Sequence, residues 1–113
     1  MSRQTTEILE DALTHLRTID SYARRDLDDP LVVEAICMRL SAAIEVLATL
    51  DAVARQQIFG SDWPLMWGMR KRIAHGYMLV DADIVRATIA QDVPNITAQI
   101  ETWLSIGATE LTD

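Results

Sequence analysis

Residues 30–50 of the chain, PLVVEAICMRLSAAIEVLATL, decide its fold. Apolar residues recur in this stretch at intervals of three and four, which is the spacing of one helical face, and further apolar residues flank that face. The stretch is therefore apolar over more than half of a helix's circumference. Such a helix packs against more than one neighbour, either within a small bundle or at a subunit interface. Asp29 suits its N-cap and Pro30 its first position, and we expect it to run to about residue 55.

Helical periodicity also covers the chain on both sides of this stretch. Residues 2–28 are expected to form one long helix with a single apolar face. After a connection at residues 56–62, a third helix is expected to begin near Pro64. It is expected to end near His75, because Gly76 can adopt the left-handed conformation that terminates helices.

The C-terminal third is expected to add two more helical segments. Asp81 and Asp83 suit the first turn of a fourth helix, where carboxylates are favourable. Pro94 lacks a backbone donor, so we expect it to interrupt or restart that helix. A last helix is expected at residues 95–106, with a frayed tail from Gly107 onward.

Length and composition favour the same fold class. The chain has 113 residues, half of them hydrophobic, which suits a single domain over residues 1–113 with one core. Glycines and prolines are few, so turn signals for a sheet are scarce. We therefore predict an all-α fold, a small antiparallel bundle of four to five helices. The single Cys37 excludes an internal disulfide and is expected in the core. Together with the absence of an apolar leader or membrane span, it suggests a cytoplasmic protein.

The charge distribution leaves one segment for contact with a polyanion. The formal net charge of −7 argues against broad, nonspecific binding of nucleic acid. Between Trp63 and Val80, however, the chain has no acidic residue and contains the consecutive cations Arg70, Lys71 and Arg72. Any nucleic-acid contact is therefore expected to be local and to involve this segment.

His75 follows these cations closely, and an arginine with an imidazole suits one reaction in particular. In RNA cleavage the 2′-hydroxyl attacks the adjacent phosphorus, which requires proton transfer and stabilisation of charge on the phosphoryl oxygens. The guanidinium fork of Arg70 matches two such oxygens. Neither His15 nor His75 has a second ligand at metal-binding spacing, so no metal or other cofactor is expected. From spacing alone, a solvated cationic helix end explains the same residues.

Arg70, His75 and Tyr77 form the pattern Arg-x4-His-x-Tyr, which resembles the motif of the HepT-like toxins, a branch of the HEPN superfamily of helical ribonucleases. The tryptophan-rich run that leads through Gly-Met into the motif also resembles this family, as do residues 80–94 after it. The resemblance extends over roughly residues 32–104.

The resemblance implies a homodimer with a cleft at the subunit interface, acting as a metal-independent endoribonuclease toxin of a toxin–antitoxin pair. Arg70 would contact the scissile phosphate of the RNA substrate, and His75 would transfer protons. Tyr77 would be the residue that a cognate nucleotidyltransferase antitoxin modifies with AMP, whose charge would repel RNA. Lys71 and Arg72 would add phosphate contacts. The family usually has a small polar residue, commonly Asn, in place of Lys71, which either strengthens phosphate binding or displaces the hydrogen bonds that orient the arginine.

Other residues have structural interpretations from the sequence. Glu45, within the apolar stretch, is either an exposed or paired carboxylate or the partner of a buried arginine or imidazole. Trp63, Trp67 and Trp103 suit packing in the core or an interface better than base stacking, and His15 suits a structural role. The alternative function is a non-catalytic helical module that binds a protein partner, or a nucleotide-binding accessory domain.

Overall fold

The computed structural model describes residues 2–76 and 81–112, which are helical apart from their connections. The last three segments follow one another without a break, so five helical rods result, and the predicted all-α fold is confirmed. The elements in chain order are α1 (Arg3–Tyr22), α2 (Pro30–Leu47), α3 (Ala52–Phe59), α4 (Asp62–Ala74), α5 (Ala82–Ala87), the π-helical η2 (Thr88–Asp92) and α6 (Val93–Thr112).

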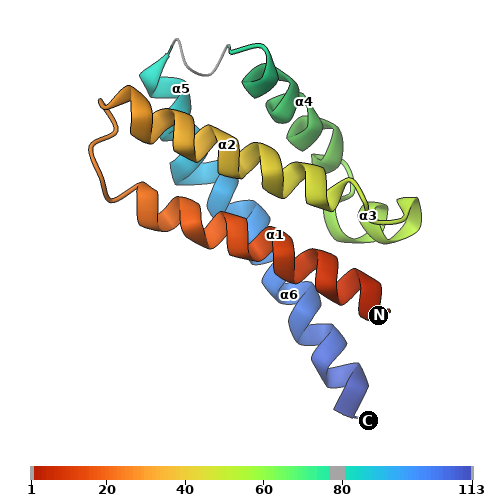
Figure 1. Cartoon of the computed structure of the whole chain (residues 1–113). Coiled ribbons are helices and arrows are strands. Elements are labelled where there is room, and N and C mark those ends of the chain that lie inside the picture. The colour runs from red at the N-terminus through yellow and green to blue at the C-terminus, as the bar shows by residue number, and fades with distance from the viewer. Residues whose placement is uncertain (1, 77–80, 113) are drawn as a thin grey trace.

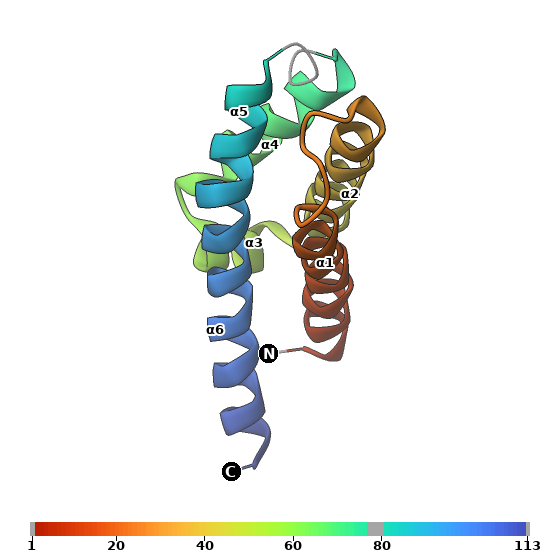
Figure 2. The same cartoon turned by 90° about the vertical axis from the view of Figure 1, so that its left-hand side faces the viewer.

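The helices pack around α2. Helices α1 and α2 form an antiparallel hairpin, and α2 also contacts α4 (Figure 1). The rod made of α5, η2 and α6 lies across the hairpin, with α6 against α1, and its C-terminal end projects past the start of α1 (Figure 2). The short α3 contacts both α4 and α6. No helix among the described residues is long and apolar enough to cross a bilayer.

The core follows from the predicted helical faces. On α1 and α2 the buried side chains recur at intervals of three and four residues, so each helix presents one stripe to the other. Burial of these aliphatic side chains is the main stabilising contribution to the bundle. The largest fully buried side chains of the two helices are Leu9, Leu16, Ile19, Ile36, Leu40, Ile44 and Leu47.

Both N-terminal helices are shorter than predicted, because polar side chains compete with the helical backbone. Helix α1 ends at Tyr22 rather than near residue 28, and the Asp26 carboxylate accepts a hydrogen bond from the Asp28 backbone N–H (2.9 Å). Its N-cap is Ser2, whose hydroxyl accepts from the backbone N–H of Thr5 (3.0 Å).

Helix α2 begins at Pro30 after the Asp29 N-cap, as predicted, but ends at Leu47 instead of residue 55. Asp51 accepts a hydrogen bond from the Ala54 N–H (2.8 Å) and so starts α3 as a new helix. Arg55 then donates from Nη1 to the carbonyls of residues 48 and 50, at 3.2 and 3.3 Å. These bonds satisfy carbonyl groups that the end of α2 leaves without helical partners.

The C-terminal rod differs from the prediction in two respects. Pro94 does not interrupt it, because the preceding residues form the wider π-helical turn, in which the Val93 N–H donates to the Thr88 carbonyl. A π-helical turn gives the proline ring room and tolerates its missing donor. Gly107 lies buried inside α6, which continues to Thr112 rather than fraying. One glycine costs a helix only about 1 kcal/mol, too little to stop a helix already formed before it.

Replacing Leu16 by alanine should destabilise the protein by about 2–5 kcal/mol, because it leaves a cavity between α1 and α2. The matched control is Leu65→Ala on α4, where the leucine is 68% exposed and the change should stay within about 0.5 kcal/mol. Urea unfolding of both variants measures the difference. Equal losses of unfolding free energy would contradict the assigned core.

Candidate active site

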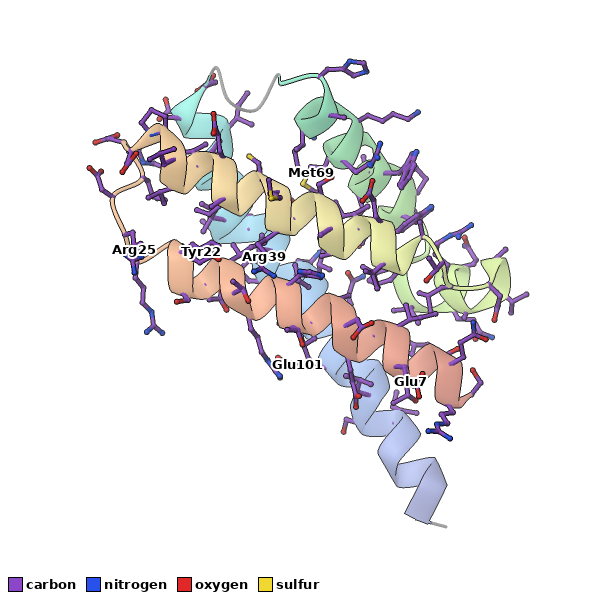
Figure 3. The ribbon with its side chains drawn as sticks, in the orientation of Figure 1. Glu7, Tyr22, Arg25, Arg39, Met69 and Glu101 are labelled. Atoms are coloured by element: carbon purple, nitrogen blue, oxygen red, sulfur yellow. The ribbon has the colours of Figure 1, made fainter. Side chains whose placement is uncertain are left out.

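Helix α4 carries the residues that the sequence singled out, and its position is set by contact with α2. Met66 and Met69 are buried on its apolar side, and Met69 lies between α4 and α2 (Figure 3). The helix ends where predicted: Gly76 has a positive φ of 75°, and its N–H donates to the Ile73 carbonyl (2.9 Å). The basic residues Lys71 and Arg72 occupy the last turn and are exposed.

Arg70 is held from two directions. Its Nε donates to Oε1 of Glu45 at 3.0 Å, and its Nη2 donates to the same oxygen. Its guanidinium carbon also lies 5.2 Å from the ring centroid of Trp67, one turn earlier on α4. Glu45 is thus a half-exposed, paired carboxylate whose partner is a partly buried arginine, so the structure combines elements of both interpretations. The side chain of Arg70 is 29% exposed and that of Glu45 50%, so both remain in contact with water.

A continuous stack of rings and guanidinium groups leads to Arg70. Arg55 lies 4.9 Å from the ring centroid of Trp63, and Trp63 stacks on Trp67 with centroids 5.9 Å apart. Trp67 in turn contacts Arg70, where this series of contacts ends. Trp63, Trp67 and Trp103 are all partly buried against the core, which confirms the packing interpretation. Trp63, Trp67 and Arg70 are four and three residues apart on one helix, a spacing that places side chains side by side. These contacts could have been predicted from that spacing but were not.

His75 lies at the C-cap of α4, immediately after its last residue. Its backbone N–H donates to the Lys71 carbonyl (3.1 Å), and the residue is exposed. Arg70 and His75 are therefore within about two turns of each other, but their positions differ by roughly 140° around the helix axis. Arg70 turns toward α2, whereas His75 lies where the chain leaves the helix. Tyr77 lies outside the residues that the structure describes.

The other histidine has a structural place, as predicted. Nη1 of Arg39 lies 3.2 Å from Nδ1 of His15, which links α2 to α1; Arg39 is labelled between these helices in Figure 3. In the described parts of the chain, no three His, Cys, Asp or Glu residues gather in a way that could hold a metal ion.

A shallow groove of about 440 Å³ runs along α2 beside the Arg70–Glu45 pair. Its lining is mostly apolar and contains carboxylates at both ends. Burial, and to a smaller extent the charge of Glu34, raises the pKa of the Cys37 thiol above its usual range. The residues that line the groove are Glu34, Cys37, Met38, Ser41, Ala42, Glu45 and Ile73.

Comparison with models of protein families identifies the family to which the chain belongs. The family model described as "Ribonuclease HepT-like" matches residues 9–103, which is most of the chain and contains all of α2 and α4. The chain belongs to the HepT-like ribonuclease family, within the HEPN superfamily. The match confirms the resemblance seen over residues 32–104 and extends it into α1. No curated protein and no solved structure gave a significant match.

Cys37 should react slowly with iodoacetamide at pH 8 in the folded protein and much faster in the urea-unfolded chain. The raised pKa keeps the thiol protonated, and only the thiolate reacts. The linked contribution to stability is present below the ordinary thiol pKa of about 8.5 and is lost as the pH rises through the higher pKa of the folded state. Alkylation rates followed by mass spectrometry provide the measurement, and equal rates in both states would contradict it.

Proposed function

We propose that this HepT-like protein is a metal-independent endoribonuclease and the toxin of a cytoplasmic toxin–antitoxin pair. The observation that carries the proposal is that the family of ribonucleases matches the chain across α4, which contains Arg70 and has His75 as its C-cap. This end of α4 is cationic in a protein whose net charge is −7, so RNA would approach here and not over the remaining surface.

In the proposed reaction the 2′-hydroxyl of one nucleotide attacks the adjacent phosphorus, and the bond to the 5′-oxygen of the next nucleotide breaks. His75 transfers the protons, for which its exposed position at the helix end gives access to substrate. Arg70 donates to the phosphoryl oxygens as negative charge develops on them. Lys71 and Arg72, exposed in the same turn, add attraction for flanking phosphates. The products are a 2′,3′-cyclic phosphate and a 5′-hydroxyl.

The active form in this proposal is a homodimer whose cleft takes residues from both copies of α4. The support is an exposed apolar surface on α2, the helix that holds Arg70 through Glu45. Leu31 and Met38 are 75% and 73% exposed there, and Met38 borders the groove beside the ion pair. Pairing of this surface with a second copy would bury it and bring two cationic helix ends toward one another.

Arg70→Ala should lower RNA cleavage by at least about 10²-fold, because it removes a charged donor to the transition state. His75→Ala should lower it by about 10²–10⁴-fold through loss of proton transfer. Both should also abolish inhibition of bacterial growth. Cleavage of a fluorescent RNA in the presence of EDTA measures the effect and tests metal independence. Products ending in 2′,3′-cyclic phosphate identify the attacking group.

The matched controls are Arg17→Ala and His15→Ala on α1, where the arginine is exposed and lies opposite Glu101 of α6. These variants should cleave RNA at the rate of the unchanged protein. Loss of all cleavage on addition of EDTA would contradict the metal-independent reaction. Full activity of both α4 variants would rule out the assigned site and favour a non-catalytic interaction module.

We also propose that a nucleotidyltransferase antitoxin silences the protein by adding AMP to Tyr77. Tyr77 is two residues after His75, so the added phosphate would place negative charge beside the proposed RNA cleft. Incubation with the partner enzyme and ATP should add the mass of AMP to the intact protein and inhibit cleavage. The matched control is Tyr77→Phe, which should retain cleavage and gain no mass. Modification at Tyr22 instead would contradict the assignment.

A further inference from the structure

The contact between Arg70 and Glu45 has a specific geometry. Nε and Nη2 of the arginine both point to one carboxylate oxygen, Oε1. These two nitrogens form one edge of the planar guanidinium group. The contact joins α4 to α2, so the position of the charged group is fixed relative to both helices and not only to its own backbone.

The edge formed by Nη1 and the second N–H of Nη2 lies outside this carboxylate contact. Like the edge that faces Glu45, this edge can donate two parallel hydrogen bonds to a phosphate group. Glu45 therefore occupies one two-donor edge of the guanidinium and leaves the other for a phosphate. The carboxylate is half-exposed, so water screens its repulsion of a phosphate on the far edge.

The indole of Trp67 restricts the remaining freedom of the guanidinium plane. The cation–π contact with the ring, at 5.2 Å from the centroid, opposes movement of the guanidinium away from the indole, and the Glu45 bonds oppose its rotation. Trp67 is itself in contact with Trp63, and the two ring centroids are 5.9 Å apart. An arginine held in this way loses less conformational entropy when it binds a phosphate than a free surface arginine would.

We propose that Glu45 is a positioning residue for Arg70: it anchors one edge of the guanidinium so that the other edge is presented to the scissile phosphate. This inference rests on the proposed ribonuclease function. It assigns to Glu45 a contribution to the rate of the chemical step, because a misplaced group loses more in the transition state than in substrate binding. It also predicts that the negative charge of Glu45 is less important than its contact.

The test compares Glu45→Gln and Glu45→Ala with the matched variants Glu34→Gln and Glu34→Ala. Glu34 lines the same groove on the same helix and is exposed, but Arg70 pairs with Glu45. For the full-length protein cleaving RNA, kcat should fall about 10-fold in Glu45→Gln and up to about 10²-fold in Glu45→Ala, with KM changed less than threefold. The Glu34 variants should leave kcat unchanged. They remove the same negative charge from α2 without removing the contact with Arg70, so they separate the two effects.

A second readout does not depend on catalysis. In the unchanged protein without RNA, the Nε–H of Arg70 should give an NMR signal that exchanges slowly with water, identified by its absence in Arg70→Lys. The signal should disappear in Glu45→Ala, weaken in Glu45→Gln and persist in the Glu34 variants. Circular dichroism and urea unfolding should show that all four variants fold, because both glutamates are solvent-accessible on α2.

The outcomes separate this inference from the proposed function. Equal or higher kcat in Glu45→Ala would overturn the positioning role and make Glu45 a competitor of phosphate. Equal losses in the Glu34 and Glu45 variants would overturn it as well, since charge alone would then explain the effect. If Arg70→Ala cleaves RNA at the normal rate, the proposed function fails, whatever the NMR signal shows.

Discussion

Burial of α2 between two neighbours is the constraint on which the rest of the structure depends. Its side chains from Ile36 to Leu47 include five that are 2% exposed or less, and it contacts both α1 and α4. A helix that is apolar over most of its circumference has to be covered on more than one side. The cover on one side is α1 and on the other is α4, and this second contact places the cationic end of α4 beside the groove on α2.

The position of α4 partly buries the positive charge of Arg70, and one carboxylate from α2 compensates for it. Arg70 is more than two-thirds covered, and a covered guanidinium group needs hydrogen-bond acceptors to offset its lost hydration. Glu45 supplies the acceptor from α2, and Trp67 covers the face of the group. A segment without acidic residues, as residues 64–79 are in the sequence, thus contains an arginine that is paired with an acid from another helix. A segment can therefore lack acidic residues in the sequence and still lie next to an acidic residue in the folded protein.

The pairing of Arg70 with Glu45 suggests how an acidic protein can act on RNA. A cluster of unpaired cations would attract phosphate but would hold it in many orientations. The end of α4 combines two kinds of cation: Lys71 and Arg72 are exposed, whereas Arg70 has a defined plane and one edge occupied. In the proposed reaction, the exposed residues supply attraction and the fixed arginine supplies orientation. His75 lies at the C-cap of α4 and is exposed.

The sequence by itself determined the features that depend on local chemistry. These are the helical faces of α1 and α2, the start of α2 at Asp29 and Pro30, the end of α4 at Gly76, and the motif that indicated the family. Only the folded structure decided where the helices break and which distant side chains meet. Arg55 and Asp51 end α2 early, a π-helical turn carries the chain through Pro94, and Glu45 meets Arg70 from 25 residues away. Periodicity reports which face of a helix is apolar, but not which side chain of another helix will face a given charge.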